Sequence, residues 1–256
     1  MGHLAGEEVL LSVAEADGSA ERMVSVQSVR SERGLRYRDW VEGNIRKVDE
    51  ATDGRVAYVY VPNTSTSGHT YFKRYFFPQT HMDGIIVDER YNGGGLVRTA
   101  ELLGDYLGGF ANDGLVFSET EYNADRNPEF TEDQRKSFFS RLGNSLDIQR
   151  FIVVASRGTA SASELVINSL APYADVLVVG DNTFGKPVGQ IGLELGDCDI
   201  LLRPTSFQNV NAFDEGDYFD GLPVTTGCEA PDDLDVPVGD FFGLGDIRND
   251  PNLEKA

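Results

Sequence analysis

The stretch that decides the fold runs from Arg157 to Gln190 and reads RGTASASELVINSLAPYADVLVVGDNTFGKPVGQ. Gly158–Ser163 is a turn of small residues, and the apolar run Glu164–Ala171 after it predicts a helix. Val176–Gly180 has the composition of a short buried strand. Lys186 then follows in a loop flanked by glycines. The pattern predicts a turn that opens a helix, a buried strand, and a loop that returns a lysine to the turn.

Outward from this stretch, apolar runs alternate with helical patterns. Further buried strands are predicted over residues 55–61, 84–88 and 151–155, with another over 198–203 and a short strand in the loop-rich region at 115–117. Helices are predicted over 37–48, 71–77 and 97–107, and a polar surface helix over 131–142 begins at the N-cap residue Thr131. The alternation predicts an α/β fold with a mostly parallel sheet, followed by an irregular segment after Pro204.

The ends of the chain carry weaker patterns. Val9–Val13 and Met23–Val26 predict a β-hairpin, which is marginal alone and therefore packs on the rest or is the remnant of another domain. The expected organisation is a hairpin segment over 1–34, a core over 35–240 and a tail over 241–256. Met1–Leu4 has the character of an added start, so we expect the natural N-terminus to lie elsewhere.

Composition excludes several classes of partner. The chain has 256 residues, 40% of them apolar, and a net charge of −20, which disfavours nucleic acid and anionic membranes. This charge favours solubility, or life in a salty medium, over a role in repelling acidic substrates. No run of about 18 apolar residues is present, so we expect no membrane span.

The two cysteines, Cys198 and Cys228, lie in polar, loop-rich sequence. Two free buried thiols are one interpretation. We favour a disulfide, which would contribute about 3 kcal/mol by closing its loop. A disulfide implies an oxidising compartment, so we expect a periplasmic or extracellular location.

Ser161 is the candidate nucleophile, and a serine needs a base to remove its proton. His3 lies in the added start, and no sequence near His69 or His81 marks an orienting acid, so each of these two is interpreted as an ordinary surface histidine. A lysine can replace histidine when it is neutral, which burial favours. Lys186 follows an apolar strand beside Phe184 and suits that role, although a solvent-exposed loop lysine is the plainer alternative.

Two features could stabilise negative charge on a reacting oxygen. Ser161 is expected at the first turn of a helix, where backbone N–H groups lack helical partners, although a plain N-cap explains it equally. Gly93–Gly95 lies between a strand and a helix and could expose N–H groups at the edge of the sheet. No Gly-Lys-Ser/Thr follows, which disfavours a phosphate loop; a purely structural turn stays open.

Three motifs together resemble the C-terminal processing (tail-specific) serine peptidases. They are Asp88–Gly95, Gly158–Glu164, and Thr183–Lys186 with Gln190, and the resemblance spans roughly residues 55–225. It implies a core of the ClpP/crotonase type. It also implies Ser161 as the nucleophile, Lys186 as general base and Gln190 as the residue that orients the lysine.

The same resemblance implies an oxyanion hole formed by the Ala162 N–H and one from the glycine turn, Gly94 ahead of Gly93. It implies a peptide or unfolded protein as substrate, with no cofactor and no metal.

Residues 35–62 resemble the core of tricorn protease instead, whose relatives use a histidine from an upstream segment that we do not find here. The PDZ domain usual in C-terminal processing peptidases is not complete in the chain, and only the hairpin over 1–34 could belong to one. A non-catalytic binding or scaffold relative is the alternative function, and a crotonase-like acyl-CoA enzyme is a third. The sequence leaves open whether the chain forms a homo-oligomer.

Overall fold

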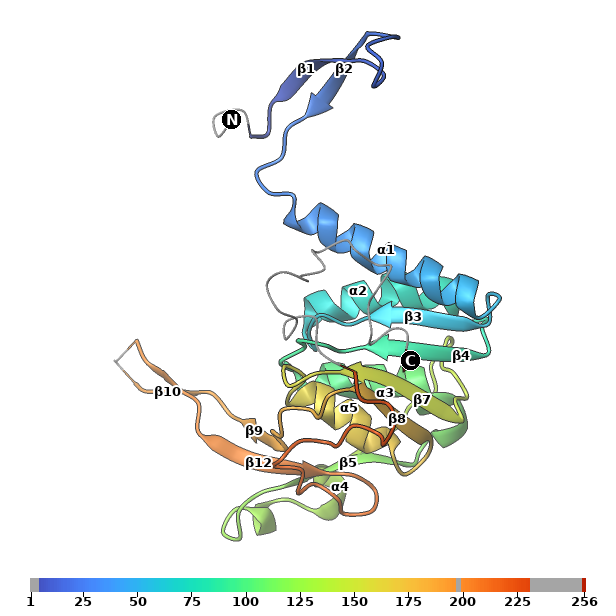
Figure 1. Ribbon diagram of the computed structural model, residues 1–256. Helices are drawn as coiled ribbons and strands as arrows, with labels where there is room; N and C mark the ends of the chain where they lie inside the picture. Colours follow the sequence, from blue (N-terminus) through green and yellow to red (C-terminus); the bar gives the residue numbers. More distant parts are fainter. Residues whose placement is uncertain (1–4, 197–198, 231–254) are drawn as a thin grey trace.

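The centre of the molecule is a parallel sheet of four strands (Figure 1). The computed structural model describes residues 5–196, 199–230 and 255–256. The sheet has the order β3-β4-β7-β8, with β3 at Val56–Tyr60, β4 at Gly84–Asp88, β7 at Arg150–Ala155 and β8 at Asp175–Gly180. Most of their apolar residues are buried, as expected of a sheet covered on both faces.

Helices cover this sheet. Helices α1 (Arg33–Ala51) and α2 (Thr66–Phe76) contact β3, while α3 (Val97–Asn112) and α5 (Ala162–Leu170) contact each other. The single-turn helices η1 (Phe77–Gln79) and η2 (Asn127–Glu129) lie in connections. Every residue of α5 is buried, which explains why this helix has no polar outer face.

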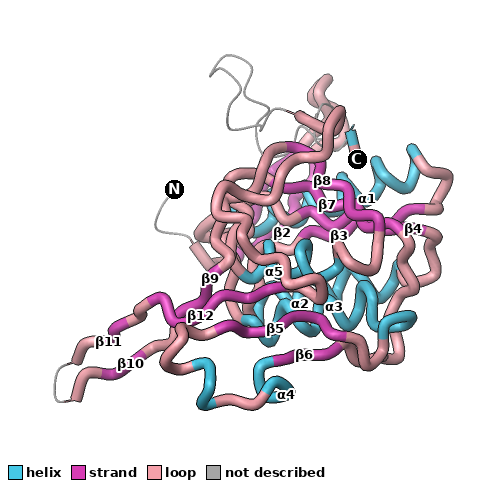
Figure 2. The backbone as a smooth tube through the Cα atoms, turned by 90° about the horizontal axis from the view of Figure 1, so that it is seen from below, coloured by secondary structure: helices cyan, strands magenta, loops and turns pink. Residues whose placement is uncertain are grey.

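A second sheet accounts for the complete burial of α5. It is antiparallel with the order β6-β5-β12-β9, and α5 contacts both β5 and β12. The α3–α5 layer therefore lies between the two sheets (Figures 1 and 2). The strands are β5 (Val116–Glu121), β6 (Lys136–Phe138), β9 (Val188–Gln190) and β12 (Thr205–Val210).

The structure corrects three sequence predictions outside the parallel sheet. The strand expected over 198–203 does not join the parallel sheet, because only β11 (Leu201–Leu202) forms and pairs with β10 (Leu193–Glu194). The segment after Pro204 begins with the regular strand β12 at Thr205–Val210, and the described residues 211–230 that follow are irregular, as predicted. The helix expected over 131–142 is only α4 (Glu132–Arg135), capped by Thr131 as predicted, and β6 follows it because it pairs with β5.

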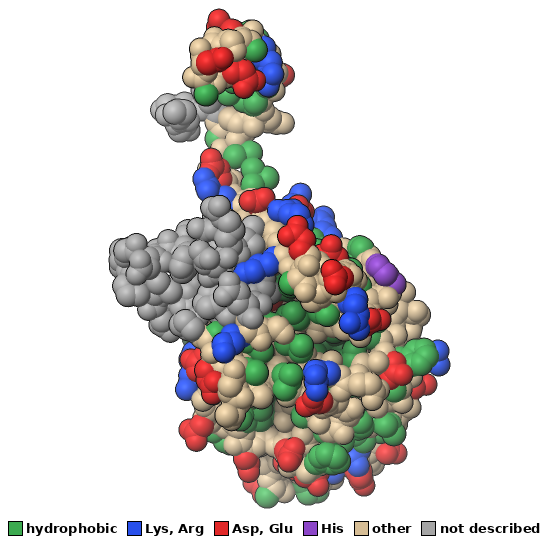
Figure 3. Space-filling model, turned by 45° about the vertical axis from the view of Figure 1, so that its right-hand side comes forward, with side chains coloured by type: hydrophobic (Ala, Val, Ile, Leu, Met, Phe, Trp, Pro, Cys, Tyr) green, Lys and Arg blue, Asp and Glu red, His purple; other side chains and the backbone are tan. Residues whose placement is uncertain are grey.

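The N-terminal hairpin forms as predicted but does not pack on the core. Strands β1 (Glu8–Val13) and β2 (Arg22–Gln27) pair in register and stand clear of the helices (Figures 1 and 3). Leu10 and Met23 are 63% and 58% exposed. Of the predicted tail over 241–256, only Lys255 and Ala256 lie within the described residues.

Acidic and basic side chains are interspersed over the face that Figure 3 shows. None of the helices in the described ranges combines the length and the apolar character that crossing a bilayer requires.

Candidate active site

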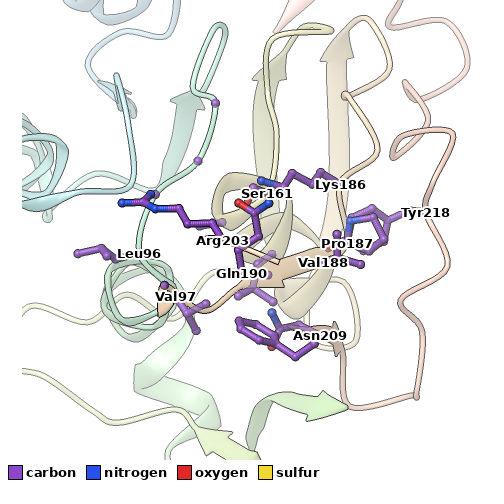
Figure 4. Close-up of a pocket in the computed structure, with 18 residues that line it drawn as sticks. Leu96, Val97, Ser161, Lys186, Pro187, Val188, Gln190, Arg203, Asn209 and Tyr218 are labelled. Atoms are coloured by element: carbon purple, nitrogen blue, oxygen red, sulfur yellow. The ribbon is translucent and has the colours of Figure 1, made fainter. Parts of the chain in front are cut away.

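The predicted site residues follow three neighbouring strands of the parallel sheet. The glycine turn follows β4, the turn with Ser161 follows β7, and the loop with Lys186 follows β8. Because parallel strands end at the same edge of a sheet, these connections meet there. They line one cleft of about 480 Å³, which Gln190 and Ala162 also line (Figure 4).

Ser161 occupies an unusual backbone conformation. Its φ and ψ are 61° and −120°, a left-handed region that is costly for a residue with a Cβ. Strain of this kind persists only where surrounding contacts hold it, and it often marks a functional turn. The next residue, Ala162, is the first of α5, so its N–H has no partner within the helix.

Glu164 is the side chain that holds this turn. Its carboxylate is fully buried and accepts four hydrogen bonds. One oxygen accepts from the N–H of Ser161 at 2.7 Å and of Lys186 at 2.9 Å. The other accepts from the Thr183 hydroxyl at 2.6 Å and the Gly185 N–H at 2.7 Å. One carboxylate therefore ties the backbone of the candidate nucleophile to that of the candidate base.

Sequence reasoning did not assign a role to Glu164, although a signal was present. A serine followed three positions later by glutamate is the spacing of a capping box, in which the glutamate reaches back to the serine N–H. The structure shows that half of the pattern, and the same carboxylate also collects donors from the loop after β8.

The glycine turn packs directly against the Ser161 turn. Gly94 has a φ of +93°, and a Cβ there would lie 2.6 Å from the Ala160 carbonyl oxygen and 2.7 Å from the Ser161 Cβ. Asn92 links the two turns, because its carbonyl oxygen accepts from the Ala160 N–H at 3.0 Å and from the Ser163 hydroxyl at 2.7 Å.

The structure qualifies the predicted oxyanion hole. The Gly94 N–H donates to Asn92 Oδ1 at 3.1 Å, so it is engaged inside the turn. Gly93 is exposed beside it and lines the same cleft. Ala162 lines the cleft as well, so the two predicted parts of the oxyanion hole, the helix N-terminus and the glycine turn, lie beside the same cleft.

A buried ion pair holds the chain segment that immediately precedes the glycine turn. Arg90 and Asp88 are 1% and 0% exposed, and the Arg90 Nη2 lies 2.7 Å from Asp88 Oδ2. The Tyr58 hydroxyl donates to the same Asp88 oxygen at 2.7 Å, and the guanidinium lies over the Trp40 ring. A buried charge pair needs such additional partners to be tolerated, and here they fix the chain just before Asn92.

Lys186 is half-buried and Gln190 is exposed at the end of β9. Figure 4 shows both side chains directed toward Ser161. No hydrogen bond in the described part of the chain joins the Ser161 hydroxyl to the Lys186 amine. Phe184 does not bury the lysine as expected, because its side chain is 59% exposed.

Tyr218 is a cleft residue that sequence reasoning missed. Burial, and then the charge of Glu164, raise the pKa of Tyr218, so its hydroxyl stays protonated and can donate a hydrogen bond. No local motif marks it, because it reaches the cleft from the loop after β12.

The histidines lie elsewhere. His69 is on α2 and stacks against Tyr106, and burial, with the charge of Lys73, lowers the pKa of His69. Neither His69 nor His81 lines the cleft, and His3 lies outside the described residues.

Within the described ranges, no group of three or more His, Cys, Asp or Glu side chains is arranged to hold a metal ion. Cys228 is half-buried, and its expected partner Cys198 lies outside the described residues. The disulfide therefore stays a prediction.

Comparison with known proteins identifies the family of the chain. The family model for peptidase family S41 matches residues 55–211. A tricorn protease homolog of Saccharolobus solfataricus is 41% identical over 91 residues, which are 36% of this chain and 8% of the relative. A carboxy-terminal-processing protease of Bartonella bacilliformis is 31% identical over 186 residues, covering 70% of this chain and 40% of the relative. The chain thus spans less than half the length of these curated relatives.

The fold is also that of known structures. The photosystem II D1 C-terminal processing protease superposes with a TM-score of 0.54 at 19% identity, over 95% of this chain and 60% of that one. The likeness confirms the expected ClpP/crotonase-like α/β core, with antiparallel strands added to it. The resemblance to both tricorn and C-terminal processing proteases is likewise confirmed. With the family model matching well over half of its length, the chain belongs to peptidase family S41.

Proposed function

We propose that this chain is a serine endopeptidase that hydrolyses peptide or unfolded protein substrates with Ser161 as nucleophile. Lys186 acts as general base, Gln190 orients the lysine, and the Ala162 N–H with one N–H of the glycine turn forms the oxyanion hole. Family membership supports the reaction class, and the shared cleft supports the residues.

The reaction proceeds through an acyl-enzyme. The Ser161 hydroxyl attacks the peptide carbonyl while its proton passes to the neutral Lys186 amine. The oxyanion of the tetrahedral intermediate accepts hydrogen bonds from the backbone N–H groups. As the C–N bond breaks, Lys186 returns the proton to the leaving amine. A water then attacks the acyl ester, and its proton returns through Lys186 to Ser161.

The observation that carries this proposal is the position of Glu164. Its carboxylate accepts hydrogen bonds from the backbones of both Ser161 and Lys186, which lie on connections after different strands. Their spacing therefore depends on one buried side chain and not on two independent loops. A nucleophile and a base gain most from such fixed relative placement.

Labelling and turnover test this proposal together. The wild-type chain should react with a fluorophosphonate probe at Ser161 and cleave an unfolded protein such as casein. Ser161→Ala should lose both, and Lys186→Ala should fall by about 10²-fold or more in turnover, since general-base catalysis contributes on that order. Lys186→Arg should be as inactive as Lys186→Ala, because a guanidinium does not release its proton.

Unchanged cleavage by Ser161→Ala would contradict the assignment of the nucleophile, and substantial activity in Lys186→Arg would contradict the assignment of the base. Loss of activity in His69→Ala alone would favour a histidine mechanism.

One observation favours the second candidate, a non-catalytic binding relative. Ser161 and Lys186 are not hydrogen-bonded to each other in this structure. Catalytic hydrogen bonds are often long before substrate binds, so the probe decides. A folded wild-type chain that neither labels nor cleaves, but binds unfolded peptides, would support the binding module.

A further inference from the structure

The charge of the cleft is opposite to that of the chain. The sequence has 42 acidic and 22 basic residues and a net charge of −20. Among the described residues that line the cleft, however, only Lys186 and Arg203 carry charge, and neither Asp nor Glu is present. Clefts lined by charge of one sign concentrate ligands of the opposite sign, so this cleft favours a negatively charged group.

Arg203 is the permanent charge of the pair. Lys186 must be neutral to accept a proton from Ser161, whereas a guanidinium keeps its charge at every accessible pH. Arg203 lies between β11 and β12, and Pro204 after it restricts its backbone to extended conformations. Figure 4 shows its side chain reaching across the cleft on the side where Leu96 lies.

The guanidinium is available to a ligand. Arg203 is exposed, and none of the ion pairs or side-chain hydrogen bonds within the described part of the chain involves it. Other residues that line the cleft, such as Val97, Gly192 and Phe207, are apolar or glycine. They offer no carboxylate that could pair with the guanidinium in place of a ligand. Five fixed N–H donors in a planar fork match a carboxylate in two-point fashion.

We propose that Arg203 is a specificity-determining residue that binds a substrate carboxylate close to the scissile bond. The inference rests on the proposed peptidase function and adds the substrate class to it. Two sources supply this chemistry: an Asp or Glu side chain next to the cleaved bond, or the terminal carboxylate of the substrate.

Matched peptides test the inference. A fluorogenic peptide that the wild type cleaves is made with Asp or Asn at each position flanking the scissile bond, and with a free or amidated C-terminus. We expect kcat/KM for one acid peptide to exceed that of its amide partner by about 10-fold, mainly through KM, because hydrogen bonds to charged groups are strong. The position at which the ratio appears distinguishes side chain from terminus.

Substitutions of Arg203 test whether this residue causes the preference for the acid peptide. Arg203→Gln should reduce the acid-to-amide ratio to about one, Arg203→Lys should keep part of it, and Arg203→Glu should invert it. Raising the salt concentration should shrink the wild-type ratio, since the contact is solvent-exposed. Arg150→Gln is the matched control: Arg150 pairs with Asp175 in an exposed position at the start of β7, away from the edge that carries the cleft.

Measurements of peptide binding, without cleavage, test the role of Arg203 independently of the proposed peptidase function. Ser161→Ala should bind the acid peptide about 10-fold more tightly than its amide partner, and Ser161→Ala with Arg203→Gln should not. If the wild type cleaves nothing but this difference persists, the peptidase proposal fails and the role of Arg203 stands. Equal ratios in wild type and Arg203→Gln, in cleavage or in binding, would overturn the inference.

Discussion

Glu89 has a buried carboxyl group that no hydrogen bond stabilises among the described residues. Its side chain is fully buried, and neither oxygen has a hydrogen-bond partner among the described residues. Burial, followed by the charges of Asp88 and Glu164, raises the pKa of Glu89 well above its ordinary value. The group is therefore protonated in the folded protein at a pH where it ionises in the unfolded chain.

This shift makes stability depend on pH. A folded pKa above the unfolded one gives a contribution that is complete below the unfolded pKa and is lost as pH rises toward the folded pKa. Glu89→Leu, similar in volume, should remove that loss and an unsatisfied polar group that costs about 1–3 kcal/mol. Urea unfolding should therefore show Glu89→Leu more stable than wild type at pH 8, with the gap narrowing toward pH 4.

Glu89→Gln separates the two effects, because it keeps a buried polar group but does not titrate. Its difference from wild type should vary with pH while its difference from Glu89→Leu stays constant. A pH-independent gap between wild type and Glu89→Gln would contradict the buried-acid interpretation.

At the level of single residues, the motifs identified Ser161, Lys186 and Gln190, which line one cleft, while their catalytic roles stay predictions. Arg203 and Tyr218 could not be found that way, because they reach the cleft from the connections before and after β12. Local sequence indicates which residues follow a strand, but the pairing of β12 with β9 depends on contacts between distant segments.

The glycine turn is the element whose conformation is most restricted. Gly94→Ala would place a Cβ against backbone atoms of Ala160 and Ala162 while holding a φ of +93°, so the turn must move away from Ser161. A Cβ added at Gly93, by contrast, would have no heavy atom within 4 Å beyond those of its own residue and its chain neighbours. We expect Gly94→Ala to lose about 10²-fold or more in kcat/KM, the effect of removing one oxyanion donor, with Gly93→Ala within a few-fold of wild type.

The two alanine variants are compared by cleavage rate and by thermal unfolding. Gly94→Ala should also lower the unfolding temperature, because neither backbone strain nor the contact with Ala160 can be relieved without shifting the turn. Equal activities in the two variants would show that the close approach of the turns is unnecessary for the reaction.

Elements with strong local patterns were predicted well, whereas short strands without such a pattern were not. The strands β3, β4, β7 and β8 are continuous apolar runs, which predict a buried parallel sheet. By contrast β6 is Lys-Ser-Phe, a sequence without strand periodicity that becomes a strand because β5 offers an open edge. The short strands β10 and β11 pair with each other in a separate two-stranded sheet, which their local sequence did not indicate either.

At the scale of the whole molecule, the N-terminal hairpin contributes little to the core. The buried apolar residues begin at Val41, and the strands of the hairpin are largely exposed. Removing residues 1–30 should therefore change the free energy of unfolding by no more than about 0.5 kcal/mol, as for exposed surface changes. Thermal unfolding of the shortened chain measures this, and a loss of several degrees would show that the hairpin docks on the core in solution.

The carboxylate of Glu164 also determines how the site should unfold locally. Three backbone amides, those of Ser161, Gly185 and Lys186, share this single acceptor group, so none can open to solvent without leaving a buried charge short of donors. Their hydrogens should exchange with deuterium at a common rate, as one cooperative unit distinct from the hairpin and the surface loops. The site is then lost all at once, by a local opening that a protein with separate loop anchors would undergo in stages.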